Sequence, residues 1–398
     1  MRAKGIKLTF LLGFFCFMAY GQMLQAGAEQ INRYRPLVYD RTVAVVANPT
    51  STVAGTHLVD TLLSLDVDLK KVFALEHGFR GDVPDGEKIA DGKDPKTGLP
   101  IVSLYGSHKK PTAEDLKGID VVIFDIQDVG VRFYTFVSSM SYIMEACADN
   151  GVQMIVLDRP NPNGFYVDGP MNHLPEPSFI GLHPVPAVHG LTLGEYATMA
   201  IGEGWLNTEN ELSLTVVTCR DYTHETLYEL PIPPSPNLRS MPAIYLYPSL
   251  CYFEGTSVSV GRGTDTPFQI VGAPWMPKGT IEFTPEGGYG SSSPKHEGEL
   301  CHGYDLTTFG RDFIPADGQL NIFWLIDAFR QCPEGEVFFS RPDYFDLLAG
   351  GPTLREQIES GMTEEQIRAS WQAELEQFKY KRKQYLLYPD FEDYRKAR

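Results

Sequence analysis

The sequence predicts an α/β protein in which a parallel sheet forms the first domain and a second domain follows it. Short apolar, β-branched runs alternate with segments of helical spacing through the first half of the 398-residue chain. This alternation is typical of parallel sheets. Residues 231–242 contain five prolines and mark the expected domain boundary. Because the chain is 43% hydrophobic, each domain can bury a core.

Each expected element follows from its local pattern. Helical spacing with capping-box pairs, Thr192 with Glu195 and Thr363 with Gln366, indicates where two of the helices begin. Trp371 lies on the apolar face of the last helix, where it is expected to pack. The expected strands are 42–50, 71–75, 101–106, 120–126, 152–158 and 211–219, and the expected helices are 56–65, 134–151, 190–205, 319–332 and 363–388.

Residues 1–28 have the composition of a secretory signal peptide. Three basic residues precede an apolar run from Leu8 to Tyr20, which is too short for a comfortable membrane span. Residues 26–28 form an A-x-A cleavage site, and Gly21 is a second candidate. We therefore expect a periplasmic or secreted protein with no membrane span.

The overall charge and the cysteines restrict the possible partners. A formal charge of −17 argues against nucleic acid, and it means that an anionic substrate must be met by local arginines. The cysteines beyond the signal peptide are odd in number and lack C-x-x-C spacing. We expect buried free thiols, and the alternative is a single disulfide formed in an oxidising compartment.

Several common site motifs are absent from the sequence. There is no G-x-S-x-G, no H-E-x-x-H, no Walker motif and no G-x-G-x-x-G after the first strand. His183 and His189 flank a proline-broken loop, which is weak evidence for a metal. We therefore expect neither a metal nor a nucleotide cofactor, despite the Rossmann-like layout.

Polar side chains gather where the expected strands end. Because the carboxyl ends of parallel strands meet at one edge of a sheet, these residues are expected to line one site. A single polar strand end is an ordinary turn, whereas five in succession indicate a binding edge. The residues are Asn48, Ser51, Glu76, His77, Arg80, Tyr105, Asp125, Gln127, Asp128, Asp158, Arg159 and Asn161.

Glu76 is the candidate catalytic acid at this edge. Leu75 and Phe79 are expected to shelter its carboxyl from water, which suits it to donate a proton. Glycoside hydrolysis typically needs a second carboxylate, which Asp125 or Asp128 can supply from a neighbouring strand end. Enzymes that use the acetamide of the substrate need only the acid. The alternative is a solvated turn with no catalytic role.

The segments 124–135 and 157–164 combine carboxylate, amide, guanidinium and phenol groups, a mixture that suits a polyhydroxylated ligand. A period of two places Asp125 and Gln127 on one side of the strand and Asp128 on the other. We therefore expect at least one of these three residues to be structural. Turn chemistry explains the asparagines of 157–164 equally well.

Longer motifs in the chain resemble the NamZ family of exo-β-N-acetylmuramidases over residues 38–390. The usual proline before the glutamate of the family is Leu75 here. The matching motifs are EHGFRGD (76–82), DPKTGLPIVSLYG (94–106), IFDIQDVGVRFYT (123–135), LDRPNPNG (157–164), VHGLTLGE (188–195), PPSPNL (233–238) and FEGTSVSVGRGTDTPFQIVGAPW (253–275).

The resemblance implies an enzyme that removes N-acetylmuramic acid from the non-reducing end of peptidoglycan fragments without a cofactor. It also implies a Rossmann-like domain at 38–238, a smaller α/β domain at 243–390 and a cleft between them. The catalytic glutamate of the family corresponds to Glu76. The candidate substrate-binding residues in the motifs are His77, Arg80, Tyr105, Gln127, Arg132, Tyr134, Asp158, Arg159, Asn161, His189, Asn237, Arg262 and Asp265.

Muramic acid carries a lactyl carboxylate, and an arginine can bind a carboxylate through two hydrogen bonds. We hypothesise that one or two of the arginines in the motifs bind this group. They are Arg80, Arg132, Arg159, Arg239 and Arg262.

Two other classes of function remain open. A non-catalytic periplasmic binding protein for wall sugars suits two domains about a cleft, but it does not need a sheltered acid. A hydrolase of an amide or ester bond in wall peptides needs a nucleophile, and the sequence contains no motif for one.

Overall fold

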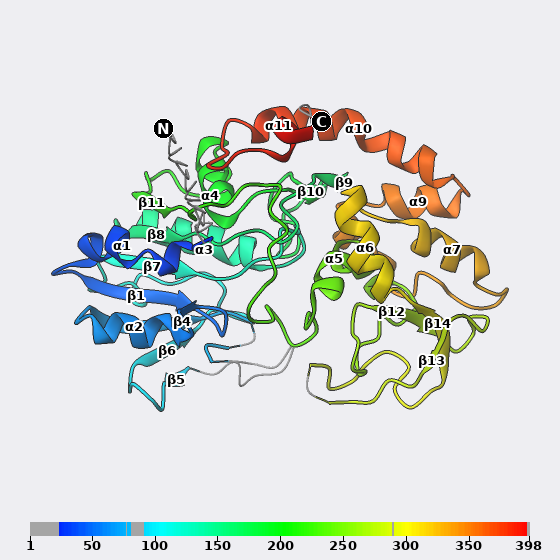
Figure 1. Cartoon of the computed structure of the whole chain (residues 1–398), viewed down its shortest axis with the longest axis horizontal. Helices are drawn as coiled ribbons and strands as arrows, with labels where there is room; N and C mark the ends of the chain where they lie inside the picture. The colour runs from blue at the N-terminus through cyan, green and yellow to red at the C-terminus, as the bar shows by residue number, and fades with distance from the viewer. Residues whose placement is uncertain (1–23, 77, 81–90, 289, 396–398) are drawn as a thin grey trace, which may run out of the picture.

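A computed structural model describes residues 24–76, 78–80, 91–288 and 290–395. The N-terminal domain contains a seven-stranded sheet in the order β11-β8-β7-β1-β4-β6-β5 (Figure 1). Every pairing in it is parallel except that of edge strand β5 with β6, which confirms the predicted parallel sheet. The strands are β1 (Thr42–Ala47), β4 (Asp68–Ala74), β5 (Gly92–Lys93), β6 (Pro100–Ser103), β7 (Val121–Asp125), β8 (Gln153–Leu157) and β11 (Leu214–Val217).

Both faces of the sheet are buried because alternate side chains of each strand enter different cores. In β1, Val43 and Val45 pack on one face with α1 (Ile31–Val38) and α2 (Leu58–Ser64). Ala44 and Val46 pack on the other face with α3 (Phe136–Asp149) and α4 (Leu193–Gly202). Helix α4 begins at the predicted capping box of Thr192.

The C-terminal domain has a different, antiparallel sheet in the order β12-β14-β13. Four of its helices, α5, α6, α8 and α9, were not predicted, and in two of them a proline interrupts the helical pattern. Pro248 lies inside α5 and Pro315 inside α6. The elements are α5 (Met241–Leu250), η2 (Cys251–Gly255), β12 (Ile270–Ala273), β13 (Ile281–Phe283), β14 (Cys301–Asp305), α6 (Thr307–Asp317), α7 (Phe323–Gln331), α8 (Pro342–Ala349) and α9 (Thr353–Glu359).

The last part of the chain returns to the N-terminal domain. Helix α10 (Glu364–Arg382) starts at the predicted capping box of Thr363. It ends earlier than the predicted 363–388, and α11 (Phe391–Arg395) follows it. In Figure 1 the two helices run along the top of the molecule from one domain to the other. Trp371 is buried in the main core, as predicted.

Two small hairpins complete the fold. Strands β2 (Thr52–Val53) and β3 (Thr56–His57) form one hairpin, and β9 (Asp168–Met171) and β10 (Pro186–Val188) form the other. Helix α10 packs on β9, so this second hairpin lies beneath the returning segment.

The described residues 24–30 are part of the fold. Ala28 is fully buried in the core beneath the sheet, and its carbonyl accepts a hydrogen bond from the Tyr34 hydroxyl at 2.9 Å. The short helix η1 (Gly27–Glu29) places the Gly27 amide 2.7 Å from the Asp158 carbonyl. Cleavage after residue 28 would remove packed residues. Gly21, the other candidate cleavage site, lies outside the described residues, as do residues 1–23 as a whole.

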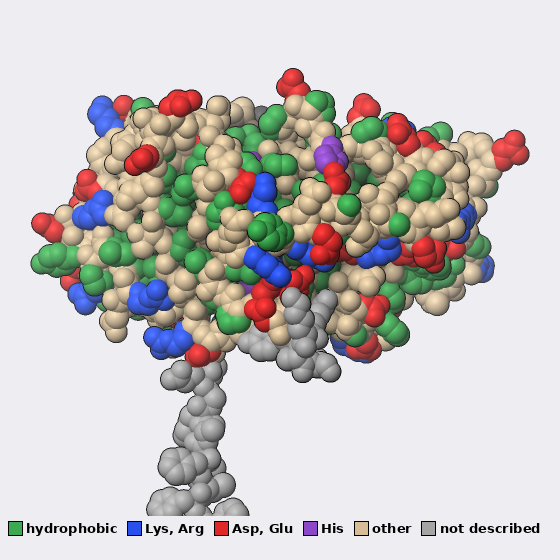
Figure 2. All heavy atoms as spheres, turned by 90° about the horizontal axis from the view of Figure 1, so that it is seen from above, with side chains coloured by type: hydrophobic (Ala, Val, Ile, Leu, Met, Phe, Trp, Pro, Cys, Tyr) green, Lys and Arg blue, Asp and Glu red, His purple; other side chains and the backbone are tan. Residues whose placement is uncertain are grey.

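The surface and the cysteines add two further facts. On the face seen in Figure 2, acidic and basic side chains are interspersed rather than gathered by sign. Cysteines 147, 219, 251, 301 and 332 are free thiols. Within the described ranges no helix has both the length and the apolarity to cross a bilayer.

The buried ion pair at the end of α10 is expected to stabilise the return of the chain. Arg382 and Asp390 are almost fully buried, with 2.9 Å between Nη1 and Oδ1, and the guanidinium also donates to the Gly190 carbonyl. Arg382→Ala should lower the free energy of unfolding by about 3–5 kcal/mol, because it leaves a buried carboxylate unpaired. Urea unfolding measures this loss.

Lys381→Ala is the matched control for that experiment. Its ammonium is half exposed and pairs with Glu203 at the surface, so its loss should cost less than about 1 kcal/mol. Equal effects of the two substitutions would contradict the role given to the buried pair.

Candidate active site

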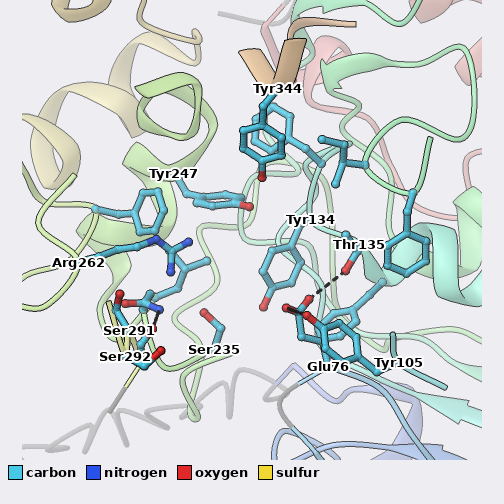
Figure 3. Close-up of a pocket in the computed structure, with 18 of the residues that line it drawn as sticks. Glu76, Tyr105, Tyr134, Thr135, Ser235, Tyr247, Arg262, Ser291, Ser292 and Tyr344 are labelled. Carbon is cyan, nitrogen blue, oxygen red and sulfur yellow. Dashed lines mark hydrogen bonds between the residues drawn. The ribbon is translucent and has the colours of Figure 1, made fainter. Parts of the chain in front are cut away.

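A cavity of about 510 Å³ lies between the two domains. The N-terminal domain, the proline-rich linker and the C-terminal domain each supply part of its wall (Figure 3). This location agrees with the expected cleft. The lining residues are Glu76, Tyr105, Phe133, Tyr134, Thr135, Phe136, Phe179, Ile180, Ser235, Asn237, Leu238, Tyr247, Arg262, Phe268, Gly290, Ser291, Ser292, Ser293 and Tyr344.

Glu76 enters this cavity from the carboxyl end of β4. Its side chain is partly buried, and one carboxyl oxygen accepts a hydrogen bond from the Tyr105 hydroxyl at 2.9 Å. The other oxygen lies 3.4 Å from the Thr135 hydroxyl at the start of α3. Glu76 supplies the one carboxylate among the described residues that line the cavity. The arrangement presents an oriented carboxyl group to whatever occupies the cavity.

Aromatic side chains form much of the wall beside Glu76. Tyr134 packs edge-to-face on Phe136 at 5.0 Å and on Tyr247 at 5.8 Å between ring centroids. The Tyr134 hydroxyl donates to the Pro234 carbonyl at 2.9 Å, which fixes the proline-rich linker against the N-terminal domain. Rings of this kind suit the apolar faces of sugars.

Arg80 does not line the cavity. Its guanidinium bonds to Asp94 at 2.8 and 3.0 Å and to Asp60 at 3.0 Å. The hydrogen bonds from Arg80 lower the pKa of Asp94 to about 2. Arg80 therefore clamps the segment that follows Glu76 to two carboxylates of its own chain. His77, the expected neighbour of Glu76, lies outside the described residues.

The strand ends of β7 and β8 are filled by the protein itself. Asp125 is fully buried and forms a two-bond ion pair with Arg159, with Nε to Oδ1 at 2.6 Å and Nη2 to Oδ2 at 2.9 Å. Asp158 is also fully buried, and its carboxylate accepts hydrogen bonds from the Thr192 and Tyr388 hydroxyls at 2.7 and 2.6 Å. Neither carboxylate reaches the cavity.

Asp128, Gln127 and Asn161 are likewise buried away from the cavity. The side-chain amide of Gln127 donates to the Pro160 carbonyl, and that of Asn161 donates to the Leu191 carbonyl. Asp128 accepts a hydrogen bond from the Gly130 amide, but its other oxygen has no partner among the described residues. Burial raises the pKa of Asp128 to about 7. The structure therefore does not bring Asp125 or Asp128 beside Glu76.

Two of the remaining candidates are buried away from the cavity. Arg132 is buried and donates to the carbonyls of Pro170, Val185 and Leu348. His189 is buried, and burial lowers its pKa to about 3.

Six further candidates differ in whether they line the cavity. Arg239 and Asp265 are exposed and do not line the cavity. Tyr134, Asn237 and Arg262 do line it, as does Tyr105.

Several lining residues were missed by sequence reasoning. Thr135 directly follows Tyr134 in a motif already identified, so its position was available. Ser291 lies in a glycine- and serine-rich stretch that resembles an ordinary loop. Tyr344 lies on α8 and gives no local signal. Among the described residues, no group of three or more His, Cys, Asp or Glu side chains is placed to hold a metal ion.

Comparison with known proteins identifies the family. Two models for the exo-beta-N-acetylmuramidase NamZ match this chain, the N-terminal one over residues 43–242 and the C-terminal one over residues 245–388. The chain belongs to the NamZ family. The two matched segments meet at residues 243–244, in the first turn of α5 and directly after the proline-rich linker.

Relatives within the NamZ family cover nearly the whole chain. The peptidoglycan beta-N-acetylmuramidase NamZ of Bacillus subtilis strain 168 is 38% identical over 377 residues, which is 89% of each chain. A crystal structure of a DUF1343 family protein from Bacteroides fragilis is 45% identical, with a TM-score of 0.85, and covers 92% of this chain and 99% of its own. A second such protein from the same organism is 27% identical, with a TM-score of 0.76 and the same coverage.

The burial of the Asp128 carboxyl predicts how the free energy of unfolding changes with pH. Its folded-state pKa of about 7 lies above the ordinary aspartate pKa of 3.8, so ionisation opposes folding. Wild-type stability should therefore fall relative to Asp128→Asn as pH rises from about 4 to about 7, and the difference should then level off. Linkage puts the full difference at about 4 kcal/mol.

Urea unfolding of both proteins across this pH range measures the difference. Other groups titrate in both proteins, so their contributions cancel in the difference in unfolding free energy. A difference that does not change with pH would contradict the position given to Asp128.

Proposed function

We propose that the chain is an exo-acting glycoside hydrolase that releases N-acetylmuramic acid from the non-reducing end of peptidoglycan fragments. The observation that carries the proposal is Glu76, whose carboxyl enters an aromatic-lined cavity and is held by Tyr105 and Thr135. The Bacillus subtilis relative is a peptidoglycan beta-N-acetylmuramidase, which supports the choice of substrate.

The geometry suits Glu76 to act as a general acid. Its protonated carboxyl would donate to the glycosidic oxygen while the bond from that oxygen to C1 breaks. Water then supplies the hydroxyl of the released sugar at C1, and its proton restores the acid. The hydroxyl of Tyr105, which bonds one carboxyl oxygen, orients the group during this exchange. One carboxyl is sufficient where the acetamide of the substrate acts as nucleophile.

We also propose that the protein is exported and that its signal peptide is cut before residue 24. The basic, then apolar, start of the sequence supports export. The burial of Ala26 and Ala28 and the hydrogen bond from the Gly27 amide support a cleavage site upstream of these residues. A periplasmic or secreted location would bring the enzyme to wall fragments.

Glu76→Gln should abolish release of N-acetylmuramic acid from its β-linked disaccharide with N-acetylglucosamine. The amide cannot donate a proton as an acid does, so turnover should fall by about 100-fold or more. Chromatographic detection of the freed sugar measures it, and the thermal unfolding midpoint checks that the variant is folded.

Glu114→Gln is the matched control, because Glu114 is 80% exposed and lies outside the cavity. It should turn over the disaccharide at the wild-type rate. If Glu76→Gln turned over the disaccharide as fast as wild type, Glu76 would not be the catalytic acid. Binding without any release by wild type would favour the sugar-binding protein instead.

Expression of the full chain in a bacterium that exports it should yield a mature protein whose N-terminus lies at or before residue 24. N-terminal sequencing of the exported protein measures this position. A mature chain that begins at Glu29 would contradict the proposed cleavage, and retention of residues 1–23 would contradict export with processing.

A further inference from the structure

A second cavity of about 210 Å³ adjoins the candidate active site. The two cavities share Arg262, Ser291 and Ser293 in their walls. Arg262 therefore stands at the junction between them. Figure 3 shows it on the opposite wall of the main cavity from Glu76.

The second cavity is rich in positive charge. Arg262, Lys295 and Arg341 line it, and among the described residues Glu254 supplies the one carboxylate in its wall. Arg262 Nε lies 2.7 Å from the Glu254 carboxyl. Burial raises the pKa of Glu254, yet the three nearby cations outweigh it and hold that pKa below its usual value. Three cations around one carboxylate leave an excess of positive charge, in a chain whose formal charge is −17.

Lys295 contributes charge rather than a contact to a ligand. Its ammonium donates to the carbonyls of Phe253 and Val258 at 2.9 Å and also to that of Thr256. These three bonds use all three of its donors. The lysine is therefore fixed in place, and its charge adds to the positive potential of the cavity that it lines with Arg262.

The loop around Arg262 is held firmly. Gly261 and Gly263 have φ angles of +77° and +79°, a conformation that side chains other than glycine rarely adopt. A Cβ on Gly263 would lie 2.6 Å from the ring of Pro294. The guanidinium also lies over the Phe268 ring at 5.0 Å. This Gly-Arg-Gly sequence, which matched no cofactor motif, thus serves to position an arginine.

Of the five arginines in the motifs, Arg262 is the one that lines the main cavity. Arg80, Arg132 and Arg159 bond to groups of their own chain away from that cavity, and Arg239 is exposed and does not line it. Arg341 lies in the second cavity and stacks over Tyr344, which lines the first.

We propose that the second cavity is the subsite for the lactyl carboxylate of the substrate sugar, with Arg262 as the specificity-determining residue and Arg341 beside it. The inference rests on the proposed function. The lactyl ether projects outward from C3 of the sugar, so a ring whose C1 lies at Glu76 can direct it to the opposite wall. N-acetylglucosamine lacks this group and leaves the excess positive charge of the subsite unneutralised.

The test compares three para-nitrophenyl glycosides in each protein: the β-N-acetylmuramide, the same compound with its lactyl carboxylate converted to a carboxamide, and the β-N-acetylglucosaminide. The measured quantity is kcat/KM for the muramide relative to the other two. Because each ratio comes from one preparation, it does not depend on the fraction of folded enzyme.

In Arg262→Gln both ratios should fall by about 10- to 100-fold, as expected for loss of a charged hydrogen bond. Arg262→Lys should recover part of the loss, and Arg341→Gln should show a smaller fall. The control is Arg311→Gln, which removes an exposed arginine of the same domain that lines neither cavity. Its ratios should match those of wild type.

Unchanged ratios in Arg262→Gln, with slower turnover of all three compounds, would overturn the inference and reduce Arg262 to a structural partner of Glu254. If Arg262→Gln does not fold, unchanged ratios in both Arg262→Lys and Arg341→Gln would overturn it. Failure of wild type to hydrolyse any of the three would instead overturn the proposed function, and the inference with it.

Discussion

Asp158 connects parts of the chain that are distant in sequence, and its contacts determine which half of the sheet edge can hold the candidate active site. Its carboxylate accepts hydrogen bonds from Thr192, Gly194 and Tyr388, and its carbonyl accepts one from Gly27. These partners come from the start of α4, the C-terminal segment and the N-terminal segment. A buried carboxylate must be satisfied in this way because an unpaired one is costly. The carboxyl edge of β8 is thus closed by the protein.

The other half of the sheet edge, at the carboxyl ends of β4 and β6, is open to a ligand. Glu76 and Tyr105 follow β4 and β6, and they open into the cavity that the C-terminal domain completes. That domain is joined to the first one by a continuous core and by the returning helix α10. The acid at Glu76 and the positive charge at Arg262 therefore face each other across a cavity whose walls are tied together.

Local patterns predicted the parallel sheet, two capping boxes and the position of Glu76, because each depends on a few neighbouring residues. They also predicted one polar edge, but not which strand ends are filled. That distinction depends on Tyr388, which lies 230 residues after Asp158, and on Gly27 before the first strand. Arg132 appeared to be a ligand because its bonds to distant carbonyls, such as that of Leu348, leave no trace in the local sequence.

We infer that the sugar binds between Glu76 and Arg262 rather than over the ends of β7 and β8, which the protein itself fills. A crystal structure of Glu76→Gln soaked with the disaccharide of N-acetylmuramic acid and N-acetylglucosamine tests it most directly. We expect the glycosidic oxygen within about 3 Å of the side chain at position 76 and the lactyl carboxylate against Arg262. A sugar bound over Asp125 and Asp158, or one with its lactyl group turned toward solvent, would contradict this placement.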